Sequence, residues 1–511
     1  MSGKNGHFAM KKHRYAEFRS KLNNLLKGIR PAGFGWNSWY VDVIEGDPSQ
    51  LRCWRRGAVL PGGRNWNRFV RALGEMGAQN SEFLKELESL KDWISNAREK
   101  SAARQRAIYR RATKRQPAPP GKVVNGRQFK KALTAWSEVD SGRLYGFVAA
   151  YYKGKGVPLF AYPCSAARVP LYVRPSWLTL TDRSLVMELD GIERAVDLPK
   201  RYREFLTLYA DVRKKLGHRE LWNGRVFRLS ELRSSADCLS LHFEQGRFFD
   251  ALACQYILEH EARLALATWR EGVGVEPFTL PVRDLVASTA KAIEHFCQTQ
   301  TARIGISNLL LFRSGKNAYR PMIRARGKLS MGQSGVFDTI GSGVFDIANA
   351  DASIDFDRRY KILKELYEEL LGGVDAETDI SQIEPDFFFR KPGIKELLPM
   401  LRDGRASFQV TGFCIDLIRA VPEITTVLVV RDSEYFSSYR DIFRANSEYE
   451  AGSPFVIPRR LGNVDEYLAQ RFPSNPAQPD AGMGFDPVKW SLPGAFCFYQ
   501  GLKRASGEGL L

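Results

Sequence analysis

Three glutamates in the last third of the chain have the spacing of a metal-binding group. Glu365, Glu368 and Glu369 stand at positions i, i+3 and i+4, so their carboxylates share one face if the segment is helical. Grouped like charges destabilise a helix unless a cation neutralises them, and carboxylate oxygens suit hard cations such as Mg²⁺ or Mn²⁺. The spacing favours a divalent metal site that acts on phosphates. A solvated acidic helix face is the alternative.

The segments before these glutamates predict the elements that would position them. Residues 304–312 and 319–326 have strand-like patterns, and residues 336–343 read as a strand and a glycine-bearing turn that lead toward the helix. The expected order is therefore strand, strand, strand and acidic helix.

This order and the motif Lys-Glu-Leu-Tyr-Glu-Glu resemble the Nudix family, whose signature is Gly-x5-Glu-x7-Arg-Glu-U-x-Glu-Glu-x-Gly-U, with U an aliphatic residue. The resemblance implies that Glu365 is a metal ligand or catalytic base and that Glu368 and Glu369 are the metal-binding pair. It also implies a bound Mg or Mn ion, a nucleotide-type small molecule as ligand or substrate, and an α/β/α sandwich that includes strands at 410–417 and 427–430. Glu448 is the candidate distant base, with a plain surface glutamate as the alternative.

The match to the Nudix signature has several departures. Gly343 best matches the opening glycine, but the loop over 344–359 is longer than the pattern allows, and Asn349 stands where the first glutamate is expected. Lys364 replaces the usual arginine, and one extra residue separates Glu369 from the glycine that follows. These departures favour retention of the fold over retention of catalysis.

A second motif, near the N-terminus, predicts a short helix over 47–57. Asp47 can cap free backbone N–H groups, Pro48 suits the first helical position, and Gly57 can adopt the left-handed stop. Leu51 and Trp54 would face inward on this helix. The polar and basic residues between them would face outward, where they could reach base edges or phosphates.

The pattern resembles the helix-turn-helix of phage-repressor-like (Xre-type) regulators, in which Trp54-Arg55-Arg56-Gly57, Pro61 and Ala72-Leu73-Gly74 occupy familiar places. The resemblance implies a DNA partner and pairing of two chains as a homodimer. It assigns base reading to one group of residues and phosphate contacts to another: Ser49, Gln50 and Arg52, then Arg55 and Arg56. Residues 33–40 are longer and more aromatic than the usual second helix. A helical interaction module with core tryptophans is the alternative.

Positive charge is concentrated in the same region. Residues 1–130 hold 27 Lys and Arg against 10 Asp and Glu, or +17 of the total +19. Such a local excess is the electrostatic footprint of nucleic-acid binding, because phosphate contacts release counterions. A solubilising tail and a membrane-surface patch are the alternatives.

We expect a multidomain α+β protein of 511 residues. The predicted parts are an all-α helix-turn-helix bundle with a basic helical arm over 1–116, a Pro-rich linker over 117–124, a mixed α+β middle domain of unknown role over 125–300, and a Nudix-like α/β/α sandwich over 301–511. The seven cysteines are scattered singly, which argues against a zinc site or a disulfide framework. The sequence has no stretch apolar enough to span a membrane and no signal-peptide pattern at its N-terminus, so we expect a cytoplasmic protein without a membrane partner.

Two functions follow from these motifs. The first is a DNA-binding transcriptional regulator whose Nudix-like domain senses or processes a nucleotide-type ligand. The second is a metal-dependent Nudix hydrolase that cleaves a nucleoside-diphosphate-linked substrate and is held on nucleic acid by its basic end. The concentrated charge and the departures in the signature favour the first.

Overall fold

A computed structural model of the chain describes about four fifths of residues 115–511 and three short stretches of residues 1–114. The described residues are 21–23, 70–73, 81–91, 126–193, 196, 198–217, 223–268, 279–299, 302–316, 318–326, 336–349, 351–371, 387–439, 449–451, 457–458, 461, 463–471 and 484–509. Internal contacts divide the chain into two compact units, Met1–Lys114 and Arg115–Leu511. In the first unit the described stretches are helical. In the second, the protein is a mixture of helices and sheets, which confirms the α+β class.

The second unit contains the following elements. The α-helices are α7 (Gly126–Glu138), α8 (Ser141–Gly154), α9 (Lys200–Lys215), α10 (Phe248–Thr268), α11 (Pro281–Val286), α12 (Ala290–Thr299), α13 (Ala352–Asp355), α14 (Arg358–Glu369), α15 (Ile394–Asp403), α16 (Ser433–Tyr439), α17 (Val464–Arg471) and α18 (Leu492–Gly507). The strands are β1 (Leu171–Tyr172), β2 (Leu185–Glu193), β3 (Arg225–Ser234), β4 (Leu239–Arg247), β5 (Gly305–Arg313), β6 (Ala318–Arg326), β7 (Phe337–Thr339), β8 (Gly343–Val344), β9 (Asp346–Ile347), β10 (Ala406–Asp416), β11 (Val421–Val430), β12 (Tyr449–Ala451) and β13 (Ile457–Pro458). Short 3-10 helices are η1 (Pro175–Thr179), η3 (Phe387–Arg390) and η4 (Pro487–Lys489).

The larger sheet has the strand order β1-β10-β11-β5-β6-β12, with β7 and β13 also paired to β6 and β8 paired to β5. Strands β5 and β11 are parallel, whereas β10 and β6 run antiparallel to their central neighbours. Every residue of β11 is buried, and so is nearly all of β5. Both strands are buried because helices cover both faces of the sheet, although each also holds polar residues, such as Ser307 and Glu423.

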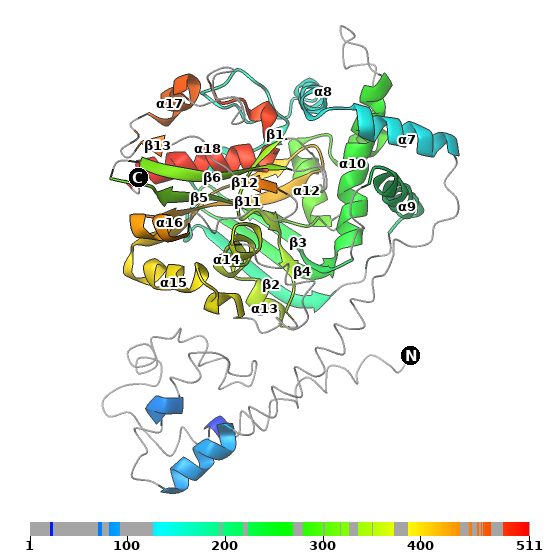
Figure 1. The fold of residues 1–511 in the computed structure, drawn as a ribbon. Coiled ribbons are helices and arrows are strands. Elements are labelled where there is room, and N and C mark those ends of the chain that lie inside the picture. Colours follow the sequence, from blue (N-terminus) through cyan, green and yellow to red (C-terminus); the bar gives the residue numbers. More distant parts are fainter. Residues whose placement is uncertain are drawn as a thin grey trace, which may run out of the picture. The chain divides into compact units, whose positions relative to one another are not determined.

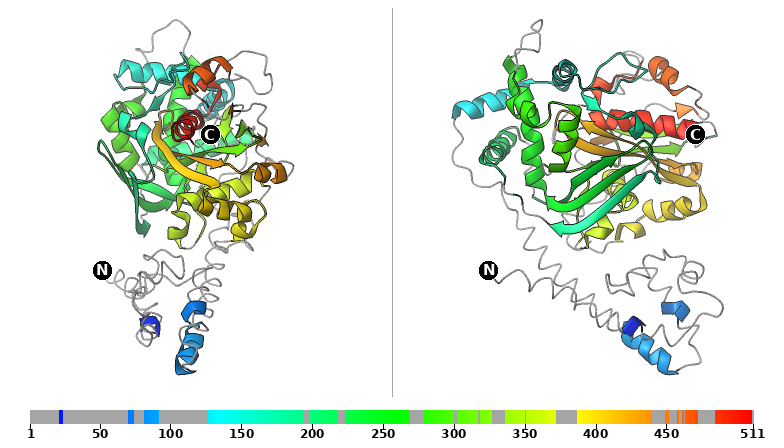
Figure 2. Two further views of the ribbon diagram at one scale, coloured as in Figure 1. Left: turned by 90° about the vertical axis from the view of Figure 1, so that its left-hand side faces the viewer. Right: turned by 180° about the vertical axis from the view of Figure 1, so that it is seen from behind.

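Figure 1 shows α18 on one side of this sheet and α14, α15 and α16 on the other. Helix α18 contacts β5, β7, β10 and β11, while α14 and α16 contact β5 and α15 contacts β10. Helix α18 starts where the Ser491 hydroxyl accepts a hydrogen bond from the Gly494 N–H at 3.1 Å, which satisfies one of the free N–H groups of the first turn. The side views in Figure 2 show the same arrangement.

A smaller sheet has the strand order β2-β4-β3-β9. Helix α10 contacts β3 and β4 on one side and α7, α8 and α9 on the other, so it lies between the smaller sheet and a layer of helices (Figure 1). Residues 239–243, whose apolar side chains alternate, belong to β4. Helices α11 and α12 are separate, and the Thr289 hydroxyl caps the second by accepting from the Ala292 N–H at 3.1 Å.

The expected boundary between residues 300 and 301 runs through a shared core. Strand β1 pairs with β10, and β3 pairs with β9, so strands from the expected middle domain belong to sheets completed by the expected C-terminal domain. The buried Arg283 guanidinium donates to the Leu258 and Ile418 carbonyl oxygens at 2.9 and 2.8 Å, which links α10 to the turn after β10. Residues 115–511 therefore form one unit, and the division into 125–300 and 301–511 is corrected.

Two further findings concern the described residues as a set. None of their helices has the length and apolar character needed to cross a membrane. The cysteines among them are free thiols, and four are buried in the core: Cys254, Cys297, Cys414 and Cys497.

Candidate functional site

The three predicted glutamates lie on helix α14. The helix begins after Asp357, whose side chain accepts a hydrogen bond from the Arg359 N–H at 2.8 Å. Glu365 and Glu369 are only 9% and 6% exposed, and Glu368 is partly buried. The alternative of a solvated acidic face is therefore wrong, and the charges of these carboxylates must be balanced by the protein or by a ligand.

Two lysines of the same helix lie beside the carboxylates. Lys361 forms ion pairs with Glu365, four residues along the helix, and with Asp346 in β9. Lys364 is 3.4 Å from Asp346 and 4.0 Å from Glu368. Burial acts to lower the pKa of Lys361, but the carboxylates of Asp346 and Glu365 outweigh it and raise that pKa above its ordinary value. The ammonium group is therefore charged inside the protein.

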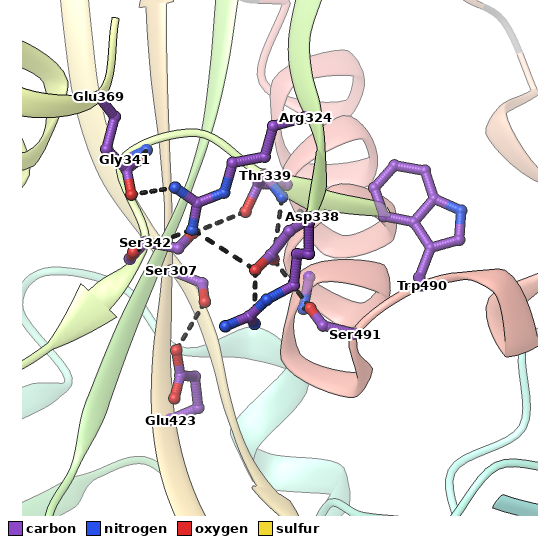
Figure 3. Close-up of polar contacts among 12 residues, drawn as sticks. Ser307, Arg324, Asp338, Thr339, Gly341, Ser342, Glu369, Glu423, Trp490 and Ser491 are labelled. Carbon is purple, nitrogen blue, oxygen red and sulfur yellow. Dashed lines mark hydrogen bonds and ion pairs between the residues drawn. The ribbon is translucent and has the colours of Figure 1, made fainter. Parts of the chain in front are cut away.

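Glu369 has a third cation as its partner, the guanidinium of Arg324 in β6 (Figure 3). The other carboxylate oxygen of Glu369 accepts a hydrogen bond from the Gly341 N–H at 2.7 Å. Burial raises the pKa of Glu369 to about 7, although the neighbouring Arg324 acts to lower it. The Glu369 carboxylate is thus bound from two sides by groups of the protein itself.

Arg324 also belongs to a polar network that reaches α18 (Figure 3). Its guanidinium lies 3.6 Å from the carboxylate of Asp338 in β7, and Arg326 donates to the same carboxylate at 3.0 Å. The other oxygen of Asp338 accepts from the Ser491 hydroxyl at 2.8 Å, at the residue that caps α18. The network joins the acidic helix on one face of the sheet to the capped helix on the other.

These contacts test whether the residues fit a divalent metal. Each α14 carboxylate has a cationic side chain of the chain within ion-pair distance, so a divalent ion would have to displace these cations from the carboxylates. Among the described residues, no group of three or more His, Cys, Asp or Glu side chains is arranged to hold a metal ion. The side chains as placed do not fit Mg²⁺ or Mn²⁺.

No family model matches this chain, and no curated protein matches it.

The two residues that the Nudix resemblance placed before α14 also have clear contacts. A Cβ atom on Gly343 would lie 2.8 Å from Oε1 of Glu365, so the absence of a side chain lets the carboxylate approach the backbone. Asn349 is buried, and its amide donates to Asp355 at 2.7 Å and to the Tyr360 hydroxyl at 3.0 Å. Asn349 thus holds the loop onto the start of α14, a structural role that a glutamate could not fill by donating hydrogen bonds.

The remaining predicted site residues lie outside the described part of the chain. They are the candidate base Glu448 and the candidate DNA-binding residues Ser49, Gln50, Arg52, Arg55 and Arg56.

Sequence reasoning missed the cations that surround the glutamates. Lys361 and Lys364 precede Glu365 and Glu368 by four residues, a spacing that itself predicts ion pairs on a helix. That signal was present in the sequence. Arg324 and Asp346 come from two separate strands, β6 and β9, and no helical spacing links them to α14.

A further buried carboxylate lies on the α18 side of the sheet. Glu423 of β11 stands opposite Gly305 of β5, and its Oε1 accepts a hydrogen bond from the Ser307 hydroxyl at 2.6 Å (Figure 3). Burial raises the pKa of Glu423 to about 8, and the nearby Asp338 acts in the same direction. Glu423 is therefore protonated at neutral pH.

We expect Glu423→Gln to remove part of the pH dependence of stability. Between about pH 4.5 and pH 8 the folded protein keeps a proton on Glu423 that the unfolded chain releases, so this group's stabilising contribution is lost as the pH rises. Relative to the unmodified protein, the free energy of unfolding of the variant should rise by about 3 kcal/mol between pH 5.5 and 8.5, measured by urea unfolding. Glu434→Gln, at an exposed site in α16, is the control. Parallel pH profiles for all three proteins would show that Glu423 is already ionised at neutral pH.

Proposed function

We propose that this chain is a DNA-binding regulator whose second unit, residues 115–511, senses a nucleotide-type ligand without hydrolysing it. The first unit would bind DNA, and the second would have a Nudix-like α/β/α arrangement. In support of that arrangement, β5, β6, α14, β10 and β11 occur in the order that the Nudix resemblance implies, and helices cover both faces of their sheet.

The observation that carries the proposal is the neutralisation of the α14 carboxylates by the protein's own cations. Hydrolysis of a phosphoanhydride by the Nudix route needs carboxylates that are free to bind a divalent ion, which neutralises the diphosphate and activates water. Lys361 and Arg324 hold Glu365 and Glu369 in buried ion pairs. Opening these pairs would leave buried charges uncompensated, at a cost of several kcal/mol. This arrangement supports a binding role over a catalytic one.

The DNA-binding part of the proposal is supported by charge and by the sequence motif at 47–57. Residues 1–130 carry +17 of the total charge, and the remaining 381 residues carry +2. This division is compatible with a regulator in which the basic part contacts phosphates and the nearly neutral part binds a ligand. Ligand binding would change DNA affinity only if the ligand binds more tightly to one of two states of the chain.

Turnover of nucleoside-diphosphate-linked compounds tests the absence of hydrolysis. The intact protein, a Glu368→Gln/Glu369→Gln double variant and a buffer blank are incubated with a panel of such compounds and Mg²⁺ or Mn²⁺, and phosphate release is measured after addition of a phosphatase. We expect equal, background-level release in all three. Metal-dependent release by the intact protein that is lost in the double variant would make the chain a hydrolase and end this part of the proposal.

Binding of the full chain to DNA fragments tests the other part. Arg52→Ala should weaken binding to the preferred sequence by about 10- to 100-fold and change the sequence preference, because Arg52 is assigned to base reading. Arg110→Ala/Arg111→Ala should weaken binding to all sequences and reduce its salt dependence, because these residues belong to the basic arm expected within residues 1–116, which would neutralise phosphates. Unchanged affinity and preference in Arg52→Ala would show that the helix at 47–57 does not read DNA.

A further inference from the structure

A cavity of about 550 Å³ lies beside the C-terminal half of α18. Its wall is formed by residues of α18, of η1 and of the segment around Phe160, and it includes none of the α14 residues described above. The volume falls within the range of about 300–1,000 Å³ that is usual for small-molecule sites. The cavity is thus a second place on this unit where a ligand can bind.

Aromatic and aliphatic side chains form most of the cavity wall. Phe160 and Tyr499 lie next to each other, with ring centroids 6.1 Å apart and planes at 60°, and Leu178 contributes an aliphatic surface. Tyr499 is held in place because its hydroxyl donates to Asp465 at 2.6 Å. Rigid rings of this kind offer a favourable surface to a flat, apolar or aromatic ligand.

One buried polar side chain in the wall has no partner in the described part of the chain. Gln500 is 7% exposed and lines the cavity, yet its amide makes no hydrogen bond to any residue that the structure describes. The amide atoms are not among the fully buried polar atoms that lack a partner, so the donor and acceptor of Gln500 remain open to solvent or to a ligand in the cavity. An amide that donates and accepts side by side matches the edge of a nucleobase.

The charges at the cavity are balanced by internal ion pairs. Lys503 is 3.0 Å from Asp465, and Arg504 is 2.9 Å from Glu508 while it also donates to the Leu180 carbonyl oxygen at 2.6 Å. These two ion pairs therefore add no net positive charge to the cavity wall. A ligand with two or three phosphates would gain little here, whereas an uncharged ring system with polar edges would not require a counter-charge.

We propose that this cavity binds the nucleoside part of the ligand, with the base against Phe160 and Tyr499 and its polar edge hydrogen-bonded to the Gln500 amide. The inference rests on the proposed sensing function and assigns it to the α18 cavity in place of the α14 carboxylates. It also sets the ligand class, because nucleosides bind here about as tightly as their phosphorylated forms.

Isothermal titration of the full chain with the four ribonucleosides and their 5′-mono- and diphosphates tests the inference. We expect at least one nucleoside to bind within threefold of the affinity of its monophosphate. Gln500→Met keeps the side-chain size and removes the amide, so it should weaken that nucleoside at least tenfold. Thr179→Trp, at an exposed residue of the cavity wall, should weaken it at least tenfold by filling the cavity and does not disturb the core.

The matched control is Gln298→Met, the same substitution on α12, whose amide donates to the Glu294 carbonyl oxygen away from the cavity; it should bind within twofold of the intact protein. Thermal unfolding of each variant establishes that it is folded, and Thr179→Trp provides the test if Gln500→Met is not. Nucleoside binding that both cavity variants retain would overturn the inference and leave the proposed sensing function intact. If no compound in the panel binds, both the inference and the sensing function fail, while the DNA-binding measurements stand separately.

Discussion

Replacing Arg283 by methionine should lower the free energy of unfolding by about 3–5 kcal/mol. Arg283 is fully buried, and its guanidinium donates to the Tyr152 hydroxyl at 2.9 Å and to the carbonyl oxygens of Leu258, Leu417 and Ile418. Methionine fills a similar volume but donates no hydrogen bond, so these acceptors would be left unsatisfied in the core. Urea unfolding followed by circular dichroism measures the loss.

Arg233→Met is the matched control for this prediction. Arg233 lies on β3 and pairs with Glu231 on the surface, where its side chain is 68% exposed. We expect no measurable change in its unfolding midpoint, since exposed pairs contribute little. A control and an Arg283 variant that unfold at the same urea concentration would show that the Arg283 contacts do not hold the two halves of this unit together.

Replacing Lys361 by methionine should have an effect of similar size, about 3–5 kcal/mol, because one positive charge is removed from a buried group of carboxylates. Asp346 and Glu365 would lose their closest cation, and both are largely buried. Unfolding curves in urea at pH 7.5 measure the effect.

Lys200→Met is the control for Lys361, because Lys200 also forms an i,i+4 pair, with Glu204 on the exposed face of α9. The two variants remove the same charge from the same helical spacing and differ in burial. We expect the control to unfold like the intact protein. Equal stability of the two variants at pH 7.5 would rule out Lys361 as the internal counter-ion of the site.

The sequence predicted the individual strands and helices of the second unit better than their assembly. Strand β5 was expected from its own residue pattern, β10 and β11 were expected from the Nudix resemblance, and α14 was expected from its acidic spacing. The boundary at residue 300 was wrong because the contacts that cross it, such as those of Arg283, join residues more than a hundred positions apart. Such contacts leave no local pattern in a sequence.

The candidate site was predicted in part for the same reason. The three glutamates were correctly placed on one helix, since helical spacing depends on that helix alone. Their electrostatic state could not be predicted, because Arg324 and Asp346 reach α14 from separate strands. The position of the Gln500 amide in a cavity wall was not predicted either. The other parts of that wall come from η1 and Phe160, which are distant from Gln500 in sequence.

The parallel pairing of β5 with β11 has a consequence for how the chain folds. Residues 305–313 pair with β6 and β8 nearby in the chain, but their parallel partner is at 421–430, and α18, which covers one face of the pair, follows later still. Closing so long a loop is slow, so we expect this unit to fold in milliseconds to seconds or more slowly. On the ribosome, residues 305–313 emerge well before β11 and α18, which complete their surroundings. Such a nascent chain is a natural client for chaperones that bind extended apolar segments.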